Sequence, residues 1–310
     1  MKPLLSICIP IYNRAFFLDQ TLGVFLQEKE LFNNDVQLFI SDNCSTEDLW
    51  LICKKYQDLG LNLQYHRNDE NIGMDGNFTI CFNKAIGKYV LLLGSDDIPL
   101  PGFVKMIVGF LSEDDYGLVH LKIHKNNNAV LTKYQDHDSF MKDVNYWITF
   151  ISANVVSSKY VKDIEWARFE KSMICQVPLY MEASCRSENN AILYGKFYQE
   201  GNDAKNNGGY HIFSVFVENL FAIISTYVQN GYLSQKTLES IKKSEYCEFL
   251  VRYIVECLIF KRNDRFDIEG SWQILWRYYG HKPYAYFYLA VEFLRRCSEL
   301  LLKYLKNLFN

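Results

Sequence analysis

The amino-acid sequence predicts an α/β fold with a mostly parallel central sheet, followed by a helical C-terminal region. Two observations lead to this prediction. Through roughly the first hundred residues, short apolar runs typical of strands alternate with helical patterns, and strands separated by helices form a mostly parallel sheet with right-handed crossovers. From about residue 213 onward the pattern is almost entirely helical and rich in aromatic side chains. We therefore expect two regions, residues 1–212 and 213–310.

The individual elements follow from local patterns. The run LLSICIP at residues 4–10 is short and apolar, as expected for a buried strand. Polar residues and early acids at 45–48 mark the start of a helix, and Gly60 marks its end. The expected strands are residues 4–10, 36–41, 61–66, 89–93, 116–124, 130–134 and 148–156, and the expected helices between the first four are residues 15–29, 45–59 and 77–86.

Composition and charge limit the class of protein. The net charge of −3 gives no global basic field, so no nucleic-acid partner is expected. The nine cysteines form no C-x-x-C pair and the first residues lack a signal-peptide pattern, which favours reduced thiols in a cytoplasm. No apolar stretch reaches the roughly 18–20 residues that span a bilayer. We expect a soluble or membrane-associated protein.

Polar clusters follow three of the expected strands. Ligands of open α/β sheets bind beyond the carboxyl ends of the strands, so clusters at three such ends predict a single site. In chain order they run from Pro10 to Arg14, from Ser41 to Asn43, and from Gly94 to Asp97.

The adjacent acids Asp96 and Asp97 are the sharpest chemical feature of these clusters. Two carboxylates that follow a buried strand are costly unless something neutralises them, and Mg²⁺ or Mn²⁺ prefers such oxygen ligands. The alternative is structural: Ser-Asp-Asp-Ile-Pro caps the next helix, with Pro99 near its first turn.

Asp42 and the loop at residues 67–77 each have a functional and a structural interpretation. Asp42 can accept hydrogen bonds from a nucleobase or a ribose, or it can form an Asx turn. The loop offers glycines, asparagines and Arg67 to a nucleotide, or it is a plain turn capped at Asn77. The loop lacks the spacing of a P-loop and of G-x-G-x-x-G, which argues against a nicotinamide cofactor.

Four motifs in this order resemble the family 2 glycosyltransferases of the Rossmann-like GT-A fold. They are IPIYNR after the first strand, SDNCS after the second, NIGMDGN in the loop, and GSDDIPLPG after the fourth strand. The resemblance covers residues 4–115 strongly and 116–212 loosely. It is closest to enzymes that extend surface polysaccharides, including abequosyltransferases.

The resemblance implies a role for each matching residue. Asp42 would read the base, and the acidic pair would hold Mg²⁺ or Mn²⁺, although the family often has a further acid where this chain has Gly94. His211 would complete the metal site; its alternative is the start of an aromatic helix. The implied nucleotide-sugar-binding residues are Pro10, Tyr12, Asn13, Asp42, Arg67, Asn71, Gly73, Asn77, Ser95 and Asp96, and the implied metal ligands are Asp96, Asp97 and His211.

The resemblance also implies the reaction. An inverting enzyme would move a sugar from a nucleoside-diphosphate sugar, with a UDP-sugar favoured, to a glycan or lipid-linked acceptor of a bacterial capsule or O-antigen. The family's usual Glu-Asp base is replaced here by Cys175-Gln176, and Gln cannot act as a base. Asn154 either faces the acceptor or is a polar residue at a strand edge. Candidate bases are Glu182, which we favour, then Glu170, Asp163 and Glu165.

The last thirty residues form an amphipathic pattern. Between residues 281 and 310 there are five basic and two acidic residues, and a basic amphipathic helix suits an anionic lipid surface. The alternatives are a helix packed on the catalytic domain or against a second copy in a homo-oligomer. We therefore expect a cytoplasmic protein, with a peripheral position at the inner face of the plasma membrane as one option. The apolar stripe consists of Phe287, Val291, Leu294, Ser298, Leu301, Leu305 and Leu308.

Two rival functions remain to be weighed. A nucleotidyltransferase usually has a Gly-rich basic loop after its first strand, and Tyr12-Asn13-Arg14 stands there instead. A non-catalytic nucleotide-sugar or glycan-binding relative is kept open by the missing Glu-Asp pair, because a fold alone does not fix a function.

Overall fold

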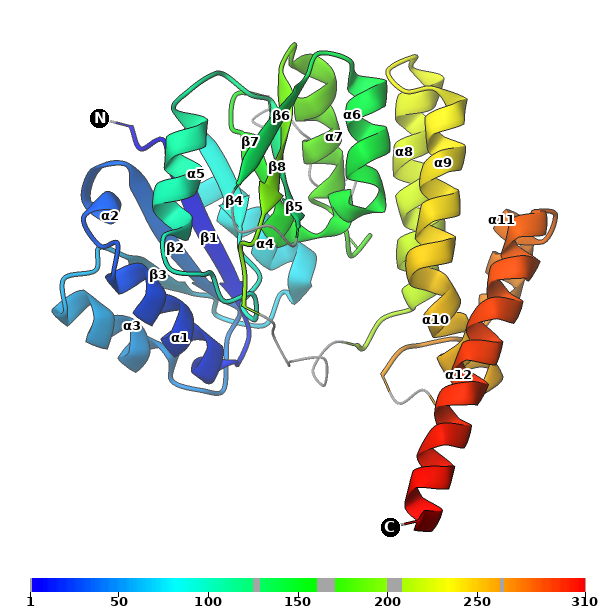
Figure 1. Cartoon of the computed structure of the whole chain (residues 1–310). Coiled ribbons are helices and arrows are strands. Elements are labelled where there is room, and N and C mark those ends of the chain that lie inside the picture. Colours follow the sequence, from blue (N-terminus) through cyan, green and yellow to red (C-terminus); the bar gives the residue numbers. More distant parts are fainter. Residues whose placement is uncertain (1, 125–128, 161–170, 200–207, 263–264, 310) are drawn as a thin grey trace. The chain divides into compact units, whose positions relative to one another are not determined.

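A computed structural model describes residues 2–124, 129–160, 171–199, 208–262 and 265–309 (Figure 1). The chain divides into two compact units, Met1–Lys205 and Asn206–Asn310. The first unit is an α/β domain and the second is helical. The predicted fold class is therefore confirmed.

The first unit is built on an eight-stranded sheet with the order β3-β2-β1-β4-β7-β5-β8-β6. The pairs β3–β2, β2–β1, β1–β4 and β5–β8 are parallel, whereas β7 runs antiparallel to both its neighbours and β6 antiparallel to β8. The strands are β1 (Leu5–Ile11), β2 (Val36–Asp42), β3 (Gln64–Arg67), β4 (Tyr89–Leu92), β5 (Leu118–Ile123), β6 (Val130–Tyr134), β7 (Asn154–Ser157) and β8 (Asn190–Gly195).

Helices cover both faces of this sheet (Figure 1). Side chains alternate along β1, so that Ile7 and Ile9 join one core cluster while the Cys8 thiol donates to the Cys81 carbonyl on the other face. The first face is covered by α1 (Ala15–Leu26), α2 (Leu31–Asn34), α3 (Leu49–Asp58) and α5 (Phe103–Leu111), and the second by α4 (Gly73–Lys84), α6 (His137–Val144) and α7 (Val177–Arg186).

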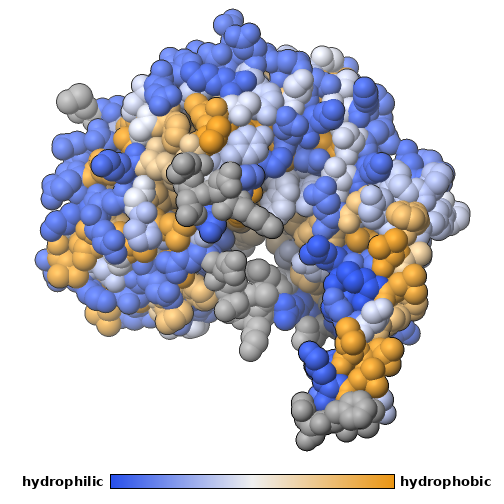
Figure 2. All heavy atoms as spheres, in the orientation of Figure 1, coloured by the Kyte–Doolittle hydropathy of each residue, from blue (hydrophilic) through white to orange (hydrophobic). Residues whose placement is uncertain are grey.

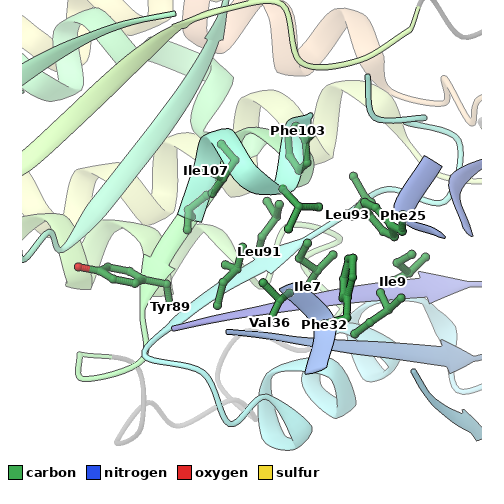
Figure 3. Close-up of a cluster of buried hydrophobic side chains, with 14 of the residues drawn as sticks. Ile7, Ile9, Phe25, Phe32, Val36, Tyr89, Leu91, Leu93, Phe103 and Ile107 are labelled. Atoms are coloured by element: carbon green, nitrogen blue, oxygen red, sulfur yellow. The ribbon is translucent and has the colours of Figure 1, made fainter. Parts of the chain in front are cut away.

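The core cluster of the first face fixes the strands that carry the site. Ile7 and Ile9 of β1 pack among Phe25, Phe32 and Leu91 (Figure 3), and all five side chains are almost completely buried. Close packing at this density resists changes of even one methylene group. The ends of β1, β2 and β4 are therefore held in fixed register.

Two of the expected elements that differ from the structure have a clear local reason. Residues 145–153 form two 3₁₀ turns, Asn145–Thr149 and Ile151–Ala153, instead of the first part of a strand. The reason is local. The Asn154 amide donates to the carbonyls of Ile148 and Phe150, which in a strand would accept backbone hydrogen bonds from a neighbouring strand. Helix α4 begins at Gly73 rather than at Asn77, because the Asn77 side chain bonds Ser41 instead of capping a helix.

The second unit consists of helices in which π-helical and α-helical segments alternate. Among the described residues, no helix is both long and apolar enough to cross a membrane. The segments are Ser214–Asn219 (π), α8 (Leu220–Gln229), α9 (Gln235–Glu245), Tyr246–Leu250 (π), α10 (Val251–Tyr253), Ile254–Ile259 (π), α11 (Ser271–Tyr279) and α12 (Pro283–Phe309).

Candidate functional site

The carboxyl ends of β1, β2 and β4 lie side by side at one edge of the sheet. Strand β1 pairs in parallel with both others, and its last residue, Ile11, stands opposite Asp42. Asp42 in turn stands opposite Arg67 of β3. The three polar clusters are therefore brought together, as the sequence predicts.

Asp42 is a completely buried carboxylate at the end of β2. Its Oδ1 accepts a hydrogen bond from the Ser45 backbone N–H at 2.8 Å. Its Oδ2 accepts from the Tyr65 hydroxyl at 2.6 Å and from Arg67 Nη1 at 3.0 Å. A buried charge needs such pairing, and burial followed by the bond to Asp42 raises the pKa of Tyr65. Both oxygens are thus engaged, so the geometry favours a positioning role over the expected direct contact with a base.

The loop after β3 is tied to the end of β2 by asparagine side chains. Asn71 Oδ1 accepts from Asn43 Nδ2 at 2.9 Å and from the Gly73 N–H at 3.0 Å. Asn77 exchanges two hydrogen bonds with Ser41, at 2.7 and 2.9 Å. Gly73 has a φ of +77°, a left-handed conformation that glycine adopts without steric cost. Asn71, Gly73 and Asn77 were expected to contact the nucleotide, and in the structure they determine the conformation of the loop.

The loop after β1 combines a fixed backbone with one exposed ring. Asn13 Oδ1 accepts from the Thr46 N–H at 2.9 Å, and the Asn13 N–H donates to Ser45 Oγ at 2.8 Å. Pro10 is buried within β1, whereas the Tyr12 side chain is exposed. Tyr12 therefore offers this edge an aromatic surface on which a base can stack.

Arg14 neutralises the acidic turn after β4. Its Nη1 lies 2.8 Å from Asp96 Oδ1 and 3.0 Å from Ser95 Oγ. Arg14 adopts a left-handed conformation with a φ of +82° at the start of α1, which is uncommon for a residue with a side chain. The pair joins positions 82 residues apart in the chain, so no local pattern in the sequence predicts it.

Asp97 lies deeper, against Ser152. Its Oδ2 accepts from Ser152 Oγ at 2.5 Å, and the same hydroxyl oxygen accepts from the Gly94 N–H at 2.8 Å. Burial, and then the charge of Asp96, raises the pKa of Asp97 to about 6. A Cβ on Gly94 would lie 2.5 Å from Asp97 Oδ2. This close approach explains why glycine stands where the family often has an acid.

The acidic turn fits a divalent ion only if a ligand completes the site. Across the residues that the structure describes, no group of three or more His, Cys, Asp or Glu side chains could hold a metal ion. Mg²⁺, however, is commonly bound by one or two carboxylates together with substrate phosphates and water. Asp96 and Asp97 provide that minimal pair.

His211 has no spare nitrogen for a metal in this structure. Its Nε2 donates to the Glu269 carbonyl at 2.7 Å, and its Nδ1 accepts from the Ser214 N–H at 3.0 Å. All three residues belong to the second unit, whereas Asp96 and Asp97 belong to the first. The geometry of the second unit therefore does not support His211 as a metal ligand.

The favoured base, Glu182, lies away from the polar edge. Its partner is Arg186, at 3.4 Å in the last turn of α7. The Arg186 guanidinium lies 6.0 Å from the centre of the Tyr160 ring, just beyond the far end of β7. Helix α7 thus carries Glu182 toward the opposite end of the sheet, and the structure contradicts its assignment as the base. The alternatives Glu170, Asp163 and Glu165 lie outside the described residues.

Asp75 is a carboxylate at this edge that the sequence analysis missed. It is 8% exposed in the first turn of α4, and its Oδ2 accepts from the Met173 N–H at 2.9 Å. Its buried Oδ1 has no hydrogen-bond partner among the described residues, and neither has the Oε1 of nearby Gln176. Unsatisfied buried oxygens are rare and need an explanation. The signal in the sequence was an acid in the first turn of a helix, hidden because that helix was expected to begin later.

Of the two alternatives for Asn154, the structure excludes a side chain that faces an acceptor. The side chain is completely buried. Its Oδ1 lies 2.9 Å from His120 Nδ1, and its amide donates to two carbonyls of the preceding turns. Asn154 therefore holds the 3₁₀ turns that carry Ser152, and it acts on the acidic turn only through them.

Two buried histidines predict that the first unit loses stability in mild acid. Burial lowers the pKa of His120 and of His137 to about 4. Each folded pKa lies below the unfolded value of about 6.5, so the unfolded chain binds protons first as the pH falls. The contribution of the two neutral histidines to stability is complete above pH 6.5 and falls toward pH 4, by about 3 kcal/mol per histidine. Urea unfolding of wild type and His120→Gln at pH 7 and 5 checks this; an equal pH dependence in both would contradict it.

Comparison with known proteins places this site in a family. The model of glycosyl transferase family 2 matches residues 6–166, just over half of the chain. Abequosyltransferase RfbV of Salmonella typhimurium is 37% identical over 100 residues, which are 30% of this chain and 28% of the relative. TarS of Staphylococcus aureus, a poly(ribitol-phosphate) beta-N-acetylglucosaminyltransferase, is 20% identical over 281 residues, 85% of this chain and 46% of the relative. Each match spans less than half of the relative's own length.

Solved structures share the fold. TarS 1–349 in complex with UDP has a TM-score of 0.57 at 16% identity, covering 94% of this chain and 89% of that chain. Mannosyltransferase PcManGT of Pyrobaculum calidifontis, in complex with GDP-Man and Mn²⁺, has a TM-score of 0.53 at 11% identity, covering 95% and 88%. At these identities the likeness establishes the GT-A fold alone. The family model, which covers most of the sheet and the acidic turn, shows that the chain belongs to glycosyl transferase family 2.

Proposed function

We propose that the chain is an inverting glycosyltransferase of bacterial surface polysaccharide synthesis, such as that of a capsule or O-antigen. It transfers a sugar from a nucleoside-diphosphate sugar, most simply a UDP-sugar, to a glycan or lipid-linked acceptor. The observation that carries the proposal is the convergence of three strand ends on the Arg14–Asp96 pair and Asp97. Relatives that build polysaccharides, including the abequosyltransferase and chondroitin synthase, support the substrate class.

In this proposal the donor lies along the edge of the sheet. The base stacks on the exposed ring of Tyr12, and Arg67, held by Asp42, presents its half-exposed guanidinium to the nucleotide. Pro10, Asn13, Asn71, Gly73 and Asn77 act by fixing the loops around it.

Charge on the departing diphosphate is balanced by this chain's cations and by a metal ion. Asp96 and Asp97 would hold Mg²⁺ or Mn²⁺, which supplies electrostatic stabilisation of the leaving group. Arg14, fixed beside Ser95 and Asp96, adds a positive charge at the same place. Preorganised charges of this kind cost no reorganisation when the reaction occurs.

Asp75 is our candidate for the base that takes the proton of the acceptor hydroxyl. Its backbone carbonyl accepts from the thiol of Cys175, the residue before Gln176, which occupies the position of the family's acid. The Oδ1 of Asp75 is unpartnered within the described chain. Met173, which covers it, has a φ of +62°, a strained conformation for a side-chain-bearing residue. An acceptor would therefore reach Asp75 when this turn shifts.

Asp75→Asn should lower transfer by about 10²–10⁴-fold, the usual contribution of a general base. Nucleotide affinity should remain, because the amide oxygen still accepts from the Met173 N–H. Glu182→Gln is the matched control and should be almost unaffected, since Glu182 pairs with Arg186. Initial rates and nucleotide binding measured on both variants decide the matter. A rate loss in Glu182→Gln with an active Asp75→Asn would reverse the assignment.

A second candidate function is a non-catalytic nucleotide-sugar or glycan-binding module. The observation in its favour is Gln176 in place of an acid, with its amide engaged by the Thr149 carbonyl at 3.0 Å. Such a protein would bind the donor without releasing the nucleotide.

The donor site is tested by thermal unfolding with a panel of nucleoside diphosphates, each with and without Mn²⁺. A ligand that binds only the folded state raises the unfolding midpoint by mass action. We expect one nucleotide to stabilise wild type in a metal-dependent manner and to lose this effect in Asp96→Asn. If no nucleotide shifts the midpoint, the proposed donor site is refuted.

A further inference from the structure

The C-terminal helix α12 carries a broad exposed apolar face. Figure 2 shows apolar residues gathered along one side of this helix and polar residues along the other. At about 100° per residue, Tyr304 and Leu302 mark the two limits of an arc of roughly 160°, and Leu294 lies at its centre. The apolar side chains of this face are 39–64% exposed, namely Phe287, Val291, Leu294, Leu301, Leu302, Tyr304 and Leu305.

The side of α12 opposite this face, together with one flank of the helix, is held against its own unit. Phe293 stacks on Phe260 with ring centres 5.7 Å apart, and Arg296 forms an ion pair with Glu256. Nearer the start of the helix, the Tyr246 hydroxyl donates to the Ala285 carbonyl at 3.1 Å. These contacts fix the rotation of the helix, so its apolar face is directed away from the body of the second unit.

The charges change along the helix. Arg295 pairs with Glu292 and Glu299, and Arg296 pairs with Glu256 and Glu299. Beyond Glu299 the charged side chains are Lys303 and Lys306, both exposed and without an ion pair in the described structure. The last turns therefore combine a wide apolar face with unpaired positive charge on the polar side.

We propose that this face of α12 docks on an anionic lipid surface. An interfacial helix places its apolar face at the boundary between headgroups and acyl chains and its lysines toward anionic headgroups. The inference rests on the proposed function in one respect: membrane docking would bring the enzyme to a lipid-linked acceptor. The lipid contact itself is independent of catalysis.

A second copy of the chain fits this face less well. Coiled coils bury a narrow seam and select their partner through opposite charges beside it. Here the seam is flanked by Tyr288, Leu302 and Arg295 on one side and by Cys297 and Tyr304 on the other. Arg295 is the one charge among them, and it has no complementary acid in the flanking positions of an identical partner.

Vesicle co-sedimentation of the whole chain tests the proposal. Wild type should bind vesicles of equal parts phosphatidylglycerol and phosphatidylcholine, and bind phosphatidylcholine alone weakly. The double variant Lys303→Gln/Lys306→Gln should bind the anionic vesicles roughly thirtyfold less tightly. Leu301→Gln/Leu305→Gln should lose about a hundredfold, because two leucines leave the lipid boundary.

The matched control is Leu51→Gln/Leu59→Gln, which makes the same change at two exposed leucines of the first unit and should bind like wild type. Wild type that shows no preference for anionic vesicles overturns the proposal, even where nucleotide binding is intact. A dimer in analytical ultracentrifugation that Leu301→Gln/Leu305→Gln dissociates, together with no lipid binding, overturns it in favour of self-association. Loss of nucleotide binding with retained vesicle binding would instead refute the proposed function alone.

Discussion

Asp97→Asn is expected to lower sugar transfer by about a hundredfold or more while making the metal-free chain more stable at neutral pH. The pKa of Asp97 is raised to about 6, chiefly by burial. Since this value lies above the unfolded value of 3.8, the folded state binds the proton more tightly. Stability is therefore lost as the pH rises from about 4 to 6, by about 3 kcal/mol at full ionisation. An asparagine carries no charge and escapes this loss.

Urea unfolding at pH 7.5 and 4.5 in a chelating buffer measures the effect. Asp97→Asn should gain stability over wild type at pH 7.5 and little at pH 4.5. Asp96→Asn is the neighbouring control: it should lose activity without gaining stability, because Asp96 already pairs with Arg14 at 2.8 Å. An Asp97→Asn protein that is less stable than wild type at pH 7.5 would contradict the account of this buried carboxyl.

Asp42→Ala is expected to destabilise the first unit by about 1–3 kcal/mol, as for hydrogen-bond donors left without their acceptor. The substitution leaves the Ser45 N–H, the Tyr65 hydroxyl and the Arg67 guanidinium without their shared acceptor. It should also weaken nucleotide binding, because Arg67 loses its fixed position. Thermal and urea unfolding, with nucleotide titration, measure both consequences.

Asp42→Asn separates positioning from direct recognition of a base. The amide keeps the shape of the carboxylate and can still accept from the Tyr65 hydroxyl. If Asp42 acts by positioning its neighbours, a larger loss of stability in a variant should be accompanied by a larger loss of nucleotide affinity. Direct reading of the base predicts a large loss of affinity with stability almost unchanged. The second pattern would refute the role that we give to Asp42.

Much of the fold was predictable because strand signals and strand ends are local. The run LLSICIP and the acids after YVLLL identify β1 and the turn after β4 without any knowledge of distant contacts. The convergence of these ends then follows from parallel pairing. The family motifs lie on these same segments, which is why the edge of the sheet where the polar clusters meet was predicted.

The contacts that give each side chain its role were not predictable in this way. Arg14 meets Asp96 from 82 positions away, and Ser152 meets Asp97 from 55. The role of Asn154 stayed open in the sequence, because a polar residue in a strand pattern does not show that it bonds two nearby carbonyls. Glu182 was favoured among four candidate carboxylates, although the sequence does not show toward which end of the sheet its helix carries it.

Nucleotide release measured during turnover tests the central claim, that this chain is a transferase and not a binding module. The experiment incubates wild type and Asp97→Asn with the nucleoside-diphosphate sugars of the nucleotide that stabilises the protein, in Mn²⁺, and follows free nucleoside diphosphate. We predict steady release from at least one donor by wild type, lowered about a hundredfold or more in Asp97→Asn. Tight donor binding without release from any donor, even when cell-envelope glycolipids are added as acceptors, would contradict the account and establish a non-catalytic protein.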